Sequence, residues 1–226
     1  MIGNKLDMVL DYCKGKVVLD IGCVEELSDF SPENLSKTQH FALKKVASKL
    51  VGIDLEEAAV DTFKKMGFEC YSCLAENAHA LNIGQFDVVV IGDIIEHIPD
   101  PHSFLVGIRP LLRKDGVVLC TTPNALAYSN TLFVLTGKRL TRYQHVCWYC
   151  KITLRNLFLY SGYHPVETHF CNFSKTARNP FRKLLDTIFC ALREELSPVL
   201  FGVFKNNPEY CEDKKIEMQK QRLFAD

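Results

Sequence analysis

Short apolar runs alternate with amphipathic stretches of helical period in the part of the chain before Pro123. Residues 17–21, 50–53 and 86–91 are rich in Val, Ile and Leu, as strands buried on both faces of a parallel sheet are. Residues 56–66 place apolar side chains three and four positions apart and end at Gly67, as a helix with a C-terminal glycine does. This alternation with short turns predicts an α/β fold with a doubly wound parallel sheet.

The same patterns place the remaining elements. Further strands are predicted at 68–73, 117–121, 166–173 and 199–205. Further helices are predicted at 6–13, 38–48, 101–112, 126–135, 153–161 and 181–192, with a polar loop at 28–36. One domain is expected to span residues 1–205, and the charged stretch 206–226 is expected to form a tail.

Composition narrows the class of protein. The chain has 226 residues, 27 Lys plus Arg and 27 Asp plus Glu, so no basic field favours a nucleic-acid partner. No apolar run reaches the roughly 20 residues that a membrane span needs, and the first residues lack the apolar region of a signal peptide. The ten cysteines are therefore expected to be reduced thiols in a cytoplasmic protein.

The first candidate site lies where the predicted strands end. Asp20 and Gly22 stand at the end of the first strand, at the sheet edge where open α/β folds bind ligands, and a glycine lets a ligand approach the backbone. Asp54 ends the second strand, where a carboxylate can accept hydrogen bonds from both hydroxyls of a ribose. Capping of the helix at 56–66 is an equally good explanation of Asp54.

The loop after the first strand argues against a dinucleotide. Val24 and Glu25 stand where the G-x-G-x-x-G fingerprint has glycines, and Glu25 and Glu26 would repel a pyrophosphate. A nicotinamide-dependent oxidoreductase is therefore the less favoured alternative. S-adenosylmethionine, which has an adenosine but no phosphate, meets no such objection.

Six segments, in order, resemble the motifs of the class I S-adenosylmethionine-dependent methyltransferases. They are VVLDIGC (17–23), VGIDLEEAAV (51–60), LAENAHAL (74–81), FDVVVIGDIIEHIPDP (86–101), LLRKDGVVLCTTPNALAY (111–128) and HVCWYCKITLRNLFLYSGY (145–163). The resemblance covers about residues 17–173. It implies a Rossmann-like, seven-stranded, mainly parallel sheet whose last strand is inserted antiparallel, and S-adenosylmethionine as cofactor.

By position in these motifs, the resemblance implies nine cofactor-binding residues. They are Asp20, Gly22 and Cys23 at the methionine end, Asp54 at the ribose, Leu55, Ala75 and Glu76 at the adenine, and Asp93 and Ile94 closing the pocket. The family's second glycine is missing, which leaves a non-catalytic binding module as an alternative. Residues 28–36 are interpreted as an insertion near the mouth of the cofactor site.

For the reaction, the resemblance implies methyl transfer to a small-molecule, sugar or lipid-linked acceptor, and we expect the acceptor atom to be oxygen. The cofactor carries the difficult chemistry, so the protein mainly aligns the reactants, and a base helps when the acceptor is a hydroxyl. His97 and His145 are the candidate bases, although either can be a structural histidine. His145, Trp148 and Tyr149 belong to residues 124–165, which we call the cover segment because this part of the family often covers the acceptor.

Two patterns in the sequence contain residue types that bind metals. Asp93, Glu96 and His97 resemble the E-x-x-E-H cation motif of quinone-precursor O-methyltransferases, but a helix-initiating acidic loop explains them, and no metal is predicted. Two C-x-x-C pairs, 70/73 and 147/150, are too far apart along the chain for a zinc ribbon. Cys23 is interpreted as a small buried filler beside the cofactor.

Overall fold

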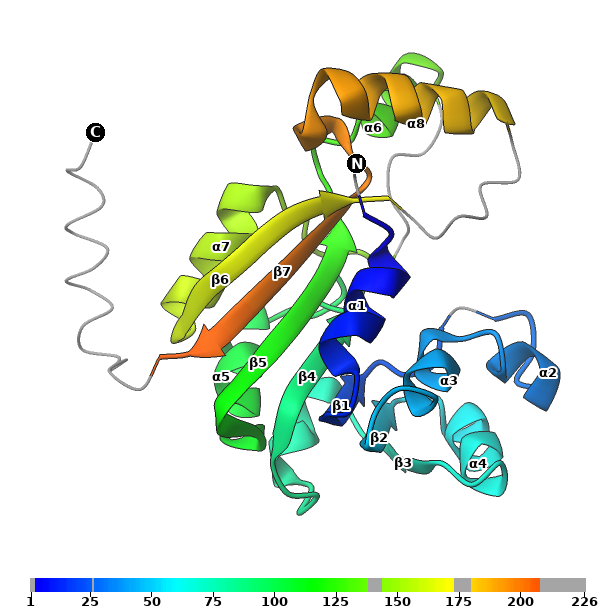
Figure 1. The fold of residues 1–226 in the computed structure, drawn as a ribbon, viewed down its shortest axis with the longest axis vertical. Coiled ribbons are helices and arrows are strands. Elements are labelled where there is room, and N and C mark those ends of the chain that lie inside the picture. Colours follow the sequence, from blue (N-terminus) through cyan, green and yellow to red (C-terminus); the bar gives the residue numbers. More distant parts are fainter. Residues whose placement is uncertain (1–2, 26, 138–143, 173–179, 208–226) are drawn as a thin grey trace.

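The computed structural model describes residues 3–25, 27–137, 144–172 and 180–207. Their strands form a seven-stranded sheet in the order β3-β2-β1-β4-β5-β7-β6 (Figure 1). In chain order the strands are β1 (Val17–Ile21), β2 (Lys49–Asp54), β3 (Glu69–Ser72), β4 (Phe86–Gly92), β5 (Leu112–Pro123), β6 (Tyr163–Cys171) and β7 (Val199–Asn206).

The sheet is parallel from β3 to β5 and antiparallel at β7. β1 pairs in parallel with β2 and β4, β2 with β3, and β4 with β5. β7 lies between β5 and β6 and is antiparallel to both, with Leu119 of β5 opposite Val203. The doubly wound sheet and the inserted antiparallel last strand are therefore confirmed.

Helices cover both faces of the sheet. They are α1 (Lys5–Cys13), α2 (Pro32–Leu35), α3 (Gln39–Lys44), α4 (Glu57–Lys65), α5 (Pro101–Ile108), α6 (Tyr128–Leu135), α7 (Lys151–Tyr160) and α8 (Pro180–Leu192), with short 3-10 turns η1 (Ala75–Ala80), η2 (Arg109–Leu111) and η3 (Glu194–Leu196). Side chains of α1, α3 and α4 share a hydrophobic cluster on one face, and those of α5 and α7 share another on the opposite face.

The central strands show why their sequences are apolar at successive positions. Val18 and Leu19 are neighbours in β1 and both are fully buried, but they belong to the clusters on opposite faces. Burying each such side chain stabilises the fold by about 1.5–3 kcal/mol. A strand with helices on both faces therefore needs an unbroken apolar run rather than an alternating one.

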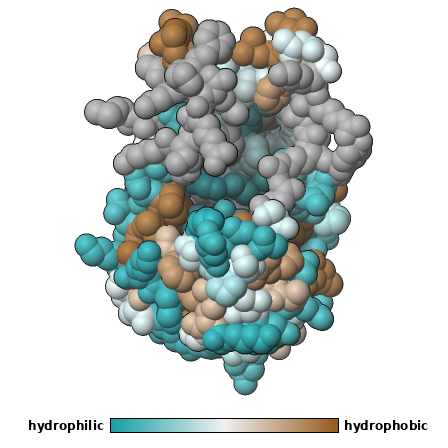
Figure 2. Space-filling model, turned by 90° about the vertical axis from the view of Figure 1, so that its right-hand side faces the viewer, coloured by the Kyte–Doolittle hydropathy of each residue, from teal (hydrophilic) through white to brown (hydrophobic). Residues whose placement is uncertain are grey.

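A pair of helices stands at one end of the sheet. In Figure 1, α6 and α8 lie together beyond the tips of β5 and β6, and the rings of Tyr128 and Phe189 stack with centroids 4.6 Å apart. Apolar side chains gather on the outside of this end of the molecule (Figure 2), and Val134, Leu135 and Leu192 are among the exposed ones. Among the described residues, no helix has the length and apolar character required to cross a bilayer.

Several expectations about the elements need correction. The predicted helix at 38–48 is only α3, because the N–H groups of Lys45 and Val46 bond to carbonyls three residues back and the chain turns into β2. The predicted loop at 28–36 contains α2, which Ser31 caps and Pro32 begins. The helix predicted at 101–112 ends at Ile108 and is followed by the 3-10 turn η2. The strand predicted at 117–121 is longer, because Leu112 already pairs with Phe86. The tail from 208 onward lies outside the described residues.

Candidate active site

The carboxyl ends of β1, β2, β4 and β5 bring the predicted site residues to one edge of the sheet. Gly22 follows β1, Asp54 ends β2, Asp93 follows β4 and Pro123 ends β5. All four strands run in the same direction, so these residues meet although they lie far apart in the sequence. This edge is where parallel α/β sheets bind ligands.

The loop after β1 has a left-handed turn that only glycine fits. Gly22 has a φ of 77°, and a Cβ there would lie 2.2 Å from Cδ1 of Ile94. Its N–H and that of Cys23 both donate to the carbonyl oxygen of Ile53, at 2.8 and 3.1 Å. Glu25, a departure from the glycine pattern, accepts a hydrogen bond from the N–H of Gln39 at 2.6 Å. The loop is therefore fixed in place even though its second glycine is missing.

Asp54 joins this loop to the start of α4. Its Oδ2 accepts a hydrogen bond from the N–H of Val24 at 2.8 Å, and its Oδ1 accepts one from the N–H of Glu56 at 3.1 Å. Burial raises the pKa of the Asp54 carboxyl, against the lowering effect of these backbone bonds. A carboxylate has about four acceptor positions, so both oxygens keep capacity for a further donor such as a hydroxyl. Leu55, beside it, is 61% exposed.

Asp20 faces the helix layer rather than the sheet edge. Its side chain is 2% exposed, and its Oδ2 lies 2.9 Å from Nδ1 of His40. Burial lowers the pKa of His40, but the hydrogen bonds to Asp20 and Cys70 and their charges outweigh it and raise the pKa to about 9. The carboxylate of Asp20 is thus already paired in the interior, and Cys23 is buried beside the same histidine.

Asp93 is held in an unusual conformation by two partners. Its φ of 52° is in the left-handed region, which is uncommon for any residue except glycine. Its Oδ2 lies 2.6 Å from Nζ of Lys5, and its Oδ1 accepts a hydrogen bond from the hydroxyl of Thr121 at 3.1 Å. Burial lowers the pKa of Lys5, but the charge and hydrogen bond of Asp93 outweigh it, and the net shift is upward. Sequence patterns gave no sign of Lys5.

The residues predicted for the adenine lie beyond β3. Ala75 and Glu76 begin η1 and are both half-buried. The N–H of Cys73 donates to the carbonyl oxygen of Asp54 at 2.9 Å, which ties this segment to the end of β2. The two segments predicted for ribose and adenine are therefore neighbours.

Glu96, His97 and His145 form a second group at the same edge. One ligand atom from each side chain lies within 4.8 Å of the other two. The two imidazole rings are perpendicular, with centroids 4.8 Å apart, and Nδ1 of His97 lies 3.2 Å from the carbonyl oxygen of Gln144. Asp93, the first residue of the motif considered for a cation, is paired with Lys5 instead, and His145 completes the group.

The buried carboxyl group of Glu96 is the unusual member of this group. Its residue is 2% exposed, and its Oε2 accepts a hydrogen bond from the hydroxyl of Thr122 at 2.9 Å. Burial, together with the charge of Asp93, raises the pKa of Glu96 to about 7. A group with this pKa exchanges its proton near neutral pH, as a general acid or base must.

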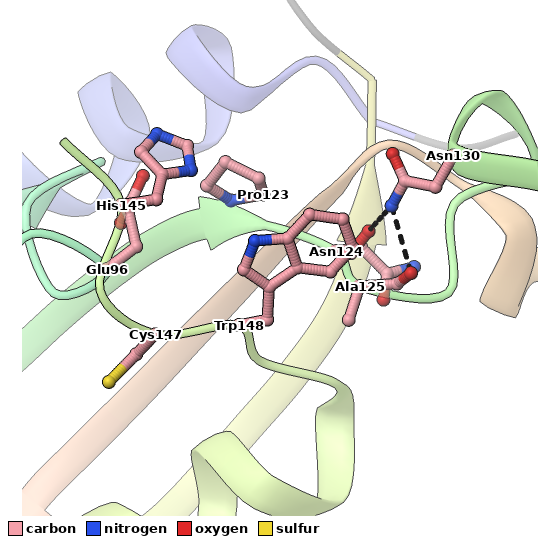
Figure 3. A pocket seen from close by; sticks show the side chains of 8 residues that line it. All are labelled: Glu96, Pro123, Asn124, Ala125, Asn130, His145, Cys147 and Trp148. Carbon is pink, nitrogen blue, oxygen red and sulfur yellow. Dashed lines mark hydrogen bonds between the residues drawn. The ribbon is translucent and has the colours of Figure 1, made fainter. Parts of the chain in front are cut away.

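A pocket opens beside this group (Figure 3). It is lined by Glu96, Pro123, Asn124, Ala125, Asn130, His145, Cys147 and Trp148. The indole of Trp148 lies between His145 and the two asparagines in Figure 3. Hydrogen bonds join three of the lining residues, because the side-chain amide of Asn130 donates to the carbonyl oxygens of Asn124 and Ala125 at 3.1 and 2.9 Å.

Only some of the aromatic and histidine side chains of the cover segment therefore line the pocket. His145 and Trp148 line it, whereas Tyr149 is buried in the hydrophobic cluster under α5 and α7. Asn124 and Asn130 are not among the predicted site residues. In the sequence, Asn124 belongs to a TPN motif without an assigned role, and Asn130 lies in a nearly apolar predicted helix. Residues 138–143 of the segment lie outside the described residues.

Comparison with known proteins gives consistent matches. A family model described as a methyltransferase domain matches residues 6–168. The ubiquinone biosynthesis O-methyltransferase of Thiobacillus denitrificans is 33% identical over 136 residues, which cover 57% of this chain and 53% of the relative. The protein of that name from Aromatoleum aromaticum is also 33% identical, over 54% of this chain and 50% of the relative. The chain thus matches about half the length of these curated relatives.

Solved structures agree on the fold. A SAM-dependent methyltransferase from Archaeoglobus fulgidus superimposes with a TM-score of 0.61 at 18% identity, covering 89% of this chain and 91% of the other. The magnesium protoporphyrin IX methyltransferase of Synechocystis, solved with bound SAH, gives a TM-score of 0.59 at 11% identity, covering 89% and 82%. At these identities the likeness concerns the arrangement of the elements.

Proposed function

This chain belongs to the methyltransferase domain family, with S-adenosylmethionine as cofactor, and from that premise we propose that it methylates an oxygen atom of a small acceptor. The observation that carries the proposal is the group formed by Glu96, His97 and His145 at the wall of a pocket on the ligand-binding edge of the sheet. The pocket would hold the acceptor, and the loop after β1 would hold the cofactor.

The chemistry of the acceptor explains why such a group favours oxygen. The methyl group leaves a sulfonium in an in-line displacement, and a hydroxyl nucleophile must lose its proton as the new bond forms. His145 lines the pocket and is placed to accept that proton. Glu96 stands within 4.8 Å of it, and the pKa of this carboxyl, raised to about 7, suits a group that shares the proton.

His97 supports this arrangement through its orientation. Its Nδ1 faces a backbone carbonyl oxygen, which only accepts hydrogen bonds, so Nδ1 carries the hydrogen and Nε2 is left as an acceptor. The bond joins His97 to the residue before His145, and the two rings are in edge-to-face contact, so His97 would position His145. The relatives are also named O-methyltransferases of ubiquinone biosynthesis, which agrees with an oxygen acceptor.

The shape of the pocket suggests the kind of acceptor. Trp148 and Pro123 offer flat apolar surfaces, and Asn130 adds an amide group on the other side. The amide of Asn124 is buried and donates to the carbonyl oxygens of Glu195 and Ser197, so it shapes the wall without offering a donor. A planar hydroxylated ring suits such walls, since aromatic side chains stack on flat ligands. We therefore place small hydroxylated rings, phenols first and sugars second, ahead of lipid-linked acceptors.

The same three side chains are of the type that binds a divalent cation, since two imidazoles and a carboxylate are common ligands. A cation held there would lower the pKa of a bound acceptor hydroxyl, in place of a protein base. Treatment with a chelator separates the two mechanisms: the base mechanism predicts no loss of activity, and the cation mechanism predicts a loss that added Mg²⁺ or Zn²⁺ restores.

On the cofactor side, we propose that Asp54 binds the ribose, that Leu55, Ala75 and Glu76 surround the adenine, and that Gly22, Asp93 and Ile94 border the methionine end. The exposure of Leu55 and the unused acceptor capacity of Asp54 support these roles. Asp20 and Cys23 would contribute through their backbone, since both side chains are buried.

The test is methyl transfer from radiolabelled S-adenosylmethionine to a panel of phenols, sugars, amines and thiols. The proposal predicts product with a hydroxylated acceptor, and a fall in kcat of at least about 100-fold for His145→Ala, the size of a general-base contribution. His164→Ala is the matched control, because His164 is an exposed histidine of β6. Transfer to amines alone, or equal kcat for both variants, would overturn the proposal.

A further inference from the structure

A second group of side chains that can bind a metal ion lies in the interior, outside the acceptor pocket. Cys23 from the loop after β1, His40 from α3 and Cys70 from β3 meet between the sheet and the helix layer. Their residues are 2%, 1% and 3% exposed, and their ligand atoms all lie within 4.8 Å of one another. Cys70 Sγ is 3.5 Å from His40 Nε2.

Gly52 of β2 makes room for this group. A Cβ on Gly52 would lie 2.7 Å from Cε1 of His40, 2.8 Å from Sγ of Cys70 and 2.9 Å from Sγ of Cys23. Atoms essentially never approach a Cβ so closely, so any other residue at this position would push the three side chains apart. The three side chains therefore converge on a position in the sheet that has no side chain.

Asp20 sets the direction of the imidazole. The carboxylate accepts the Nδ1 hydrogen of His40 at 2.9 Å, so Nε2 faces the thiols. When a metal displaces the Nε2 proton, the lone pair of this nitrogen points toward the thiols. The ring is also packed against Phe63 and Phe68, with centroids 5.0 and 5.3 Å away. A carboxylate behind a histidine in this way is the usual support of a histidine that binds a metal.

We propose that Cys23, His40 and Cys70 bind one zinc-type cation, with Asp20 orienting the histidine. Zinc–sulfur and zinc–nitrogen distances of about 2.3 and 2.0 Å at a tetrahedral angle place the two ligand atoms about 3.5 Å apart, as Cys70 and His40 are. Two thiols and an imidazole select a soft cation, whereas Mg²⁺ and Ca²⁺ prefer oxygen ligands. This site is independent of the proposed oxygen methylation.

A cation at this site would connect the loop after β1, which is proposed to hold the cofactor, to α3 and β3. Cys23 directly follows Gly22, while α3 and β3 supply the other two ligands, so a cation would link the loop to the two neighbouring elements. Its role would be structural, because all the ligands are buried and none of them lines the acceptor pocket. The group supplies three of the four ligands of a tetrahedral site, which leaves one position for a small ligand from solution. The two C-x-x-C pairs are not involved as pairs, since Cys73 is not a member of the group.

The experiment is a titration of the reduced, metal-free chain with Co²⁺, followed by displacement with Zn²⁺. Thiolate ligands give a charge-transfer absorption with cobalt, which a cation on Glu96, His97 and His145 would not produce. We expect this band to saturate at one equivalent per chain, to disappear with Zn²⁺, and to be lost in Cys70→Ser. Cys73→Ser is the matched control, because this half-buried cysteine lies three residues away and outside the group.

Two further measurements distinguish loss of the metal site from loss of folding in the variants. Circular dichroism establishes that Cys70→Ser is folded, and a second variant, His40→Gln, is expected to weaken the band in the same way. Zinc is expected to raise the Tm of the wild-type chain but not of the variants, because a ligand that binds only the folded state stabilises it. No cobalt band from the folded wild type, an unchanged band in Cys70→Ser, or a native Cys23–Cys70 disulfide found by peptide mapping would each overturn the proposal.

Discussion

Nζ of Lys5 lies 2.6 Å from Oδ2 of Asp93, and this ion pair fastens the first helix to the loop that follows β4. The two residues are 88 positions apart in the sequence. Asp93 also accepts a hydrogen bond from the hydroxyl of Thr121. The carboxylate therefore links α1, β4 and β5 at the edge where the cofactor is proposed to bind. The pair therefore supports the geometry of the site as well as the fold.

Removal of the charge from Asp93 should destabilise the protein. Asp93→Asn leaves the ammonium group of Lys5 partly buried without its counter-ion, and we expect a loss of about 1–2 kcal/mol in the free energy of unfolding. Urea unfolding of Lys5→Met, Asp93→Asn and the double variant measures the pair as a cycle. A loss of stability in the double variant that equals or exceeds the sum of the two single losses would contradict a stabilising pair.

A substitution at Gly22 should cost stability and cofactor affinity together. Gly22→Ala combines a φ of 77° with a Cβ 2.2 Å from Ile94, whereas Gly67→Ala has a similar φ of 83° and no atom within 4 Å. The control should lose about 1 kcal/mol from backbone strain alone. We expect Gly22→Ala to lose more, and to bind S-adenosylhomocysteine at least tenfold more weakly in calorimetry. Equal effects of the two variants would refute the close packing of Gly22 on Ile94.

The buried carboxyl of Glu96 predicts a pH dependence of stability. Its pKa is raised from the ordinary 4.5 to about 7, so the folded protein keeps a proton that the unfolded chain has lost between these values. The contribution of Glu96 to stability is therefore full below pH 4.5 and is lost as the pH rises through 7.

Unfolding of Glu96→Gln by urea, measured from pH 4.5 to 8, checks this prediction. The variant should gain stability relative to the wild type as the pH rises toward 7, and the difference should level off above it. A constant difference for Glu96→Gln would mean that this carboxyl has an ordinary pKa in the folded state.

Much of the fold follows from local patterns. The runs at 17–21 and 86–91 are apolar at successive positions because both faces of β1 and β4 are buried, and this is visible in the sequence without any tertiary information. The insertion of β7 between β5 and β6 is different. No periodicity encodes strand order, and the expectation came from the resemblance to a family.

The sequence predicts those residues of the candidate site that lie at the ends of strands. Gly22, Asp54 and Asp93 follow strands that run in one direction, so their meeting at one edge is a consequence of the sheet. Contacts between elements could not be predicted in this way. His40 stands between Gln39 and Phe41 on a short helix, and nothing local indicates that it turns inward to Asp20.

The interior group shows the same limit for cysteines. Spacing argued against pairing the two C-x-x-C motifs, but it carried no information on Cys23, which lies 47 positions before Cys70. The two thiols meet because β1, β2 and β3 are adjacent and Gly52 leaves room between them. The contact between the two thiols therefore depends on the order of the strands and on the glycine at position 52.

The most direct test of the cofactor site is calorimetric titration with S-adenosylhomocysteine of the wild-type chain and Asp54→Ala. Loss of a charged acceptor for the ribose hydroxyls removes about 1.5–3 kcal/mol of binding free energy, which corresponds to a tenfold or greater rise in Kd. Asp100→Ala is the control, because its carboxylate also accepts a backbone hydrogen bond at the start of a helix, from the N–H of Ser103, and Asp100 is not among the proposed cofactor residues. We predict binding by the wild type and the control and at least tenfold weaker binding by Asp54→Ala. Absence of binding by the folded wild-type chain would contradict the account.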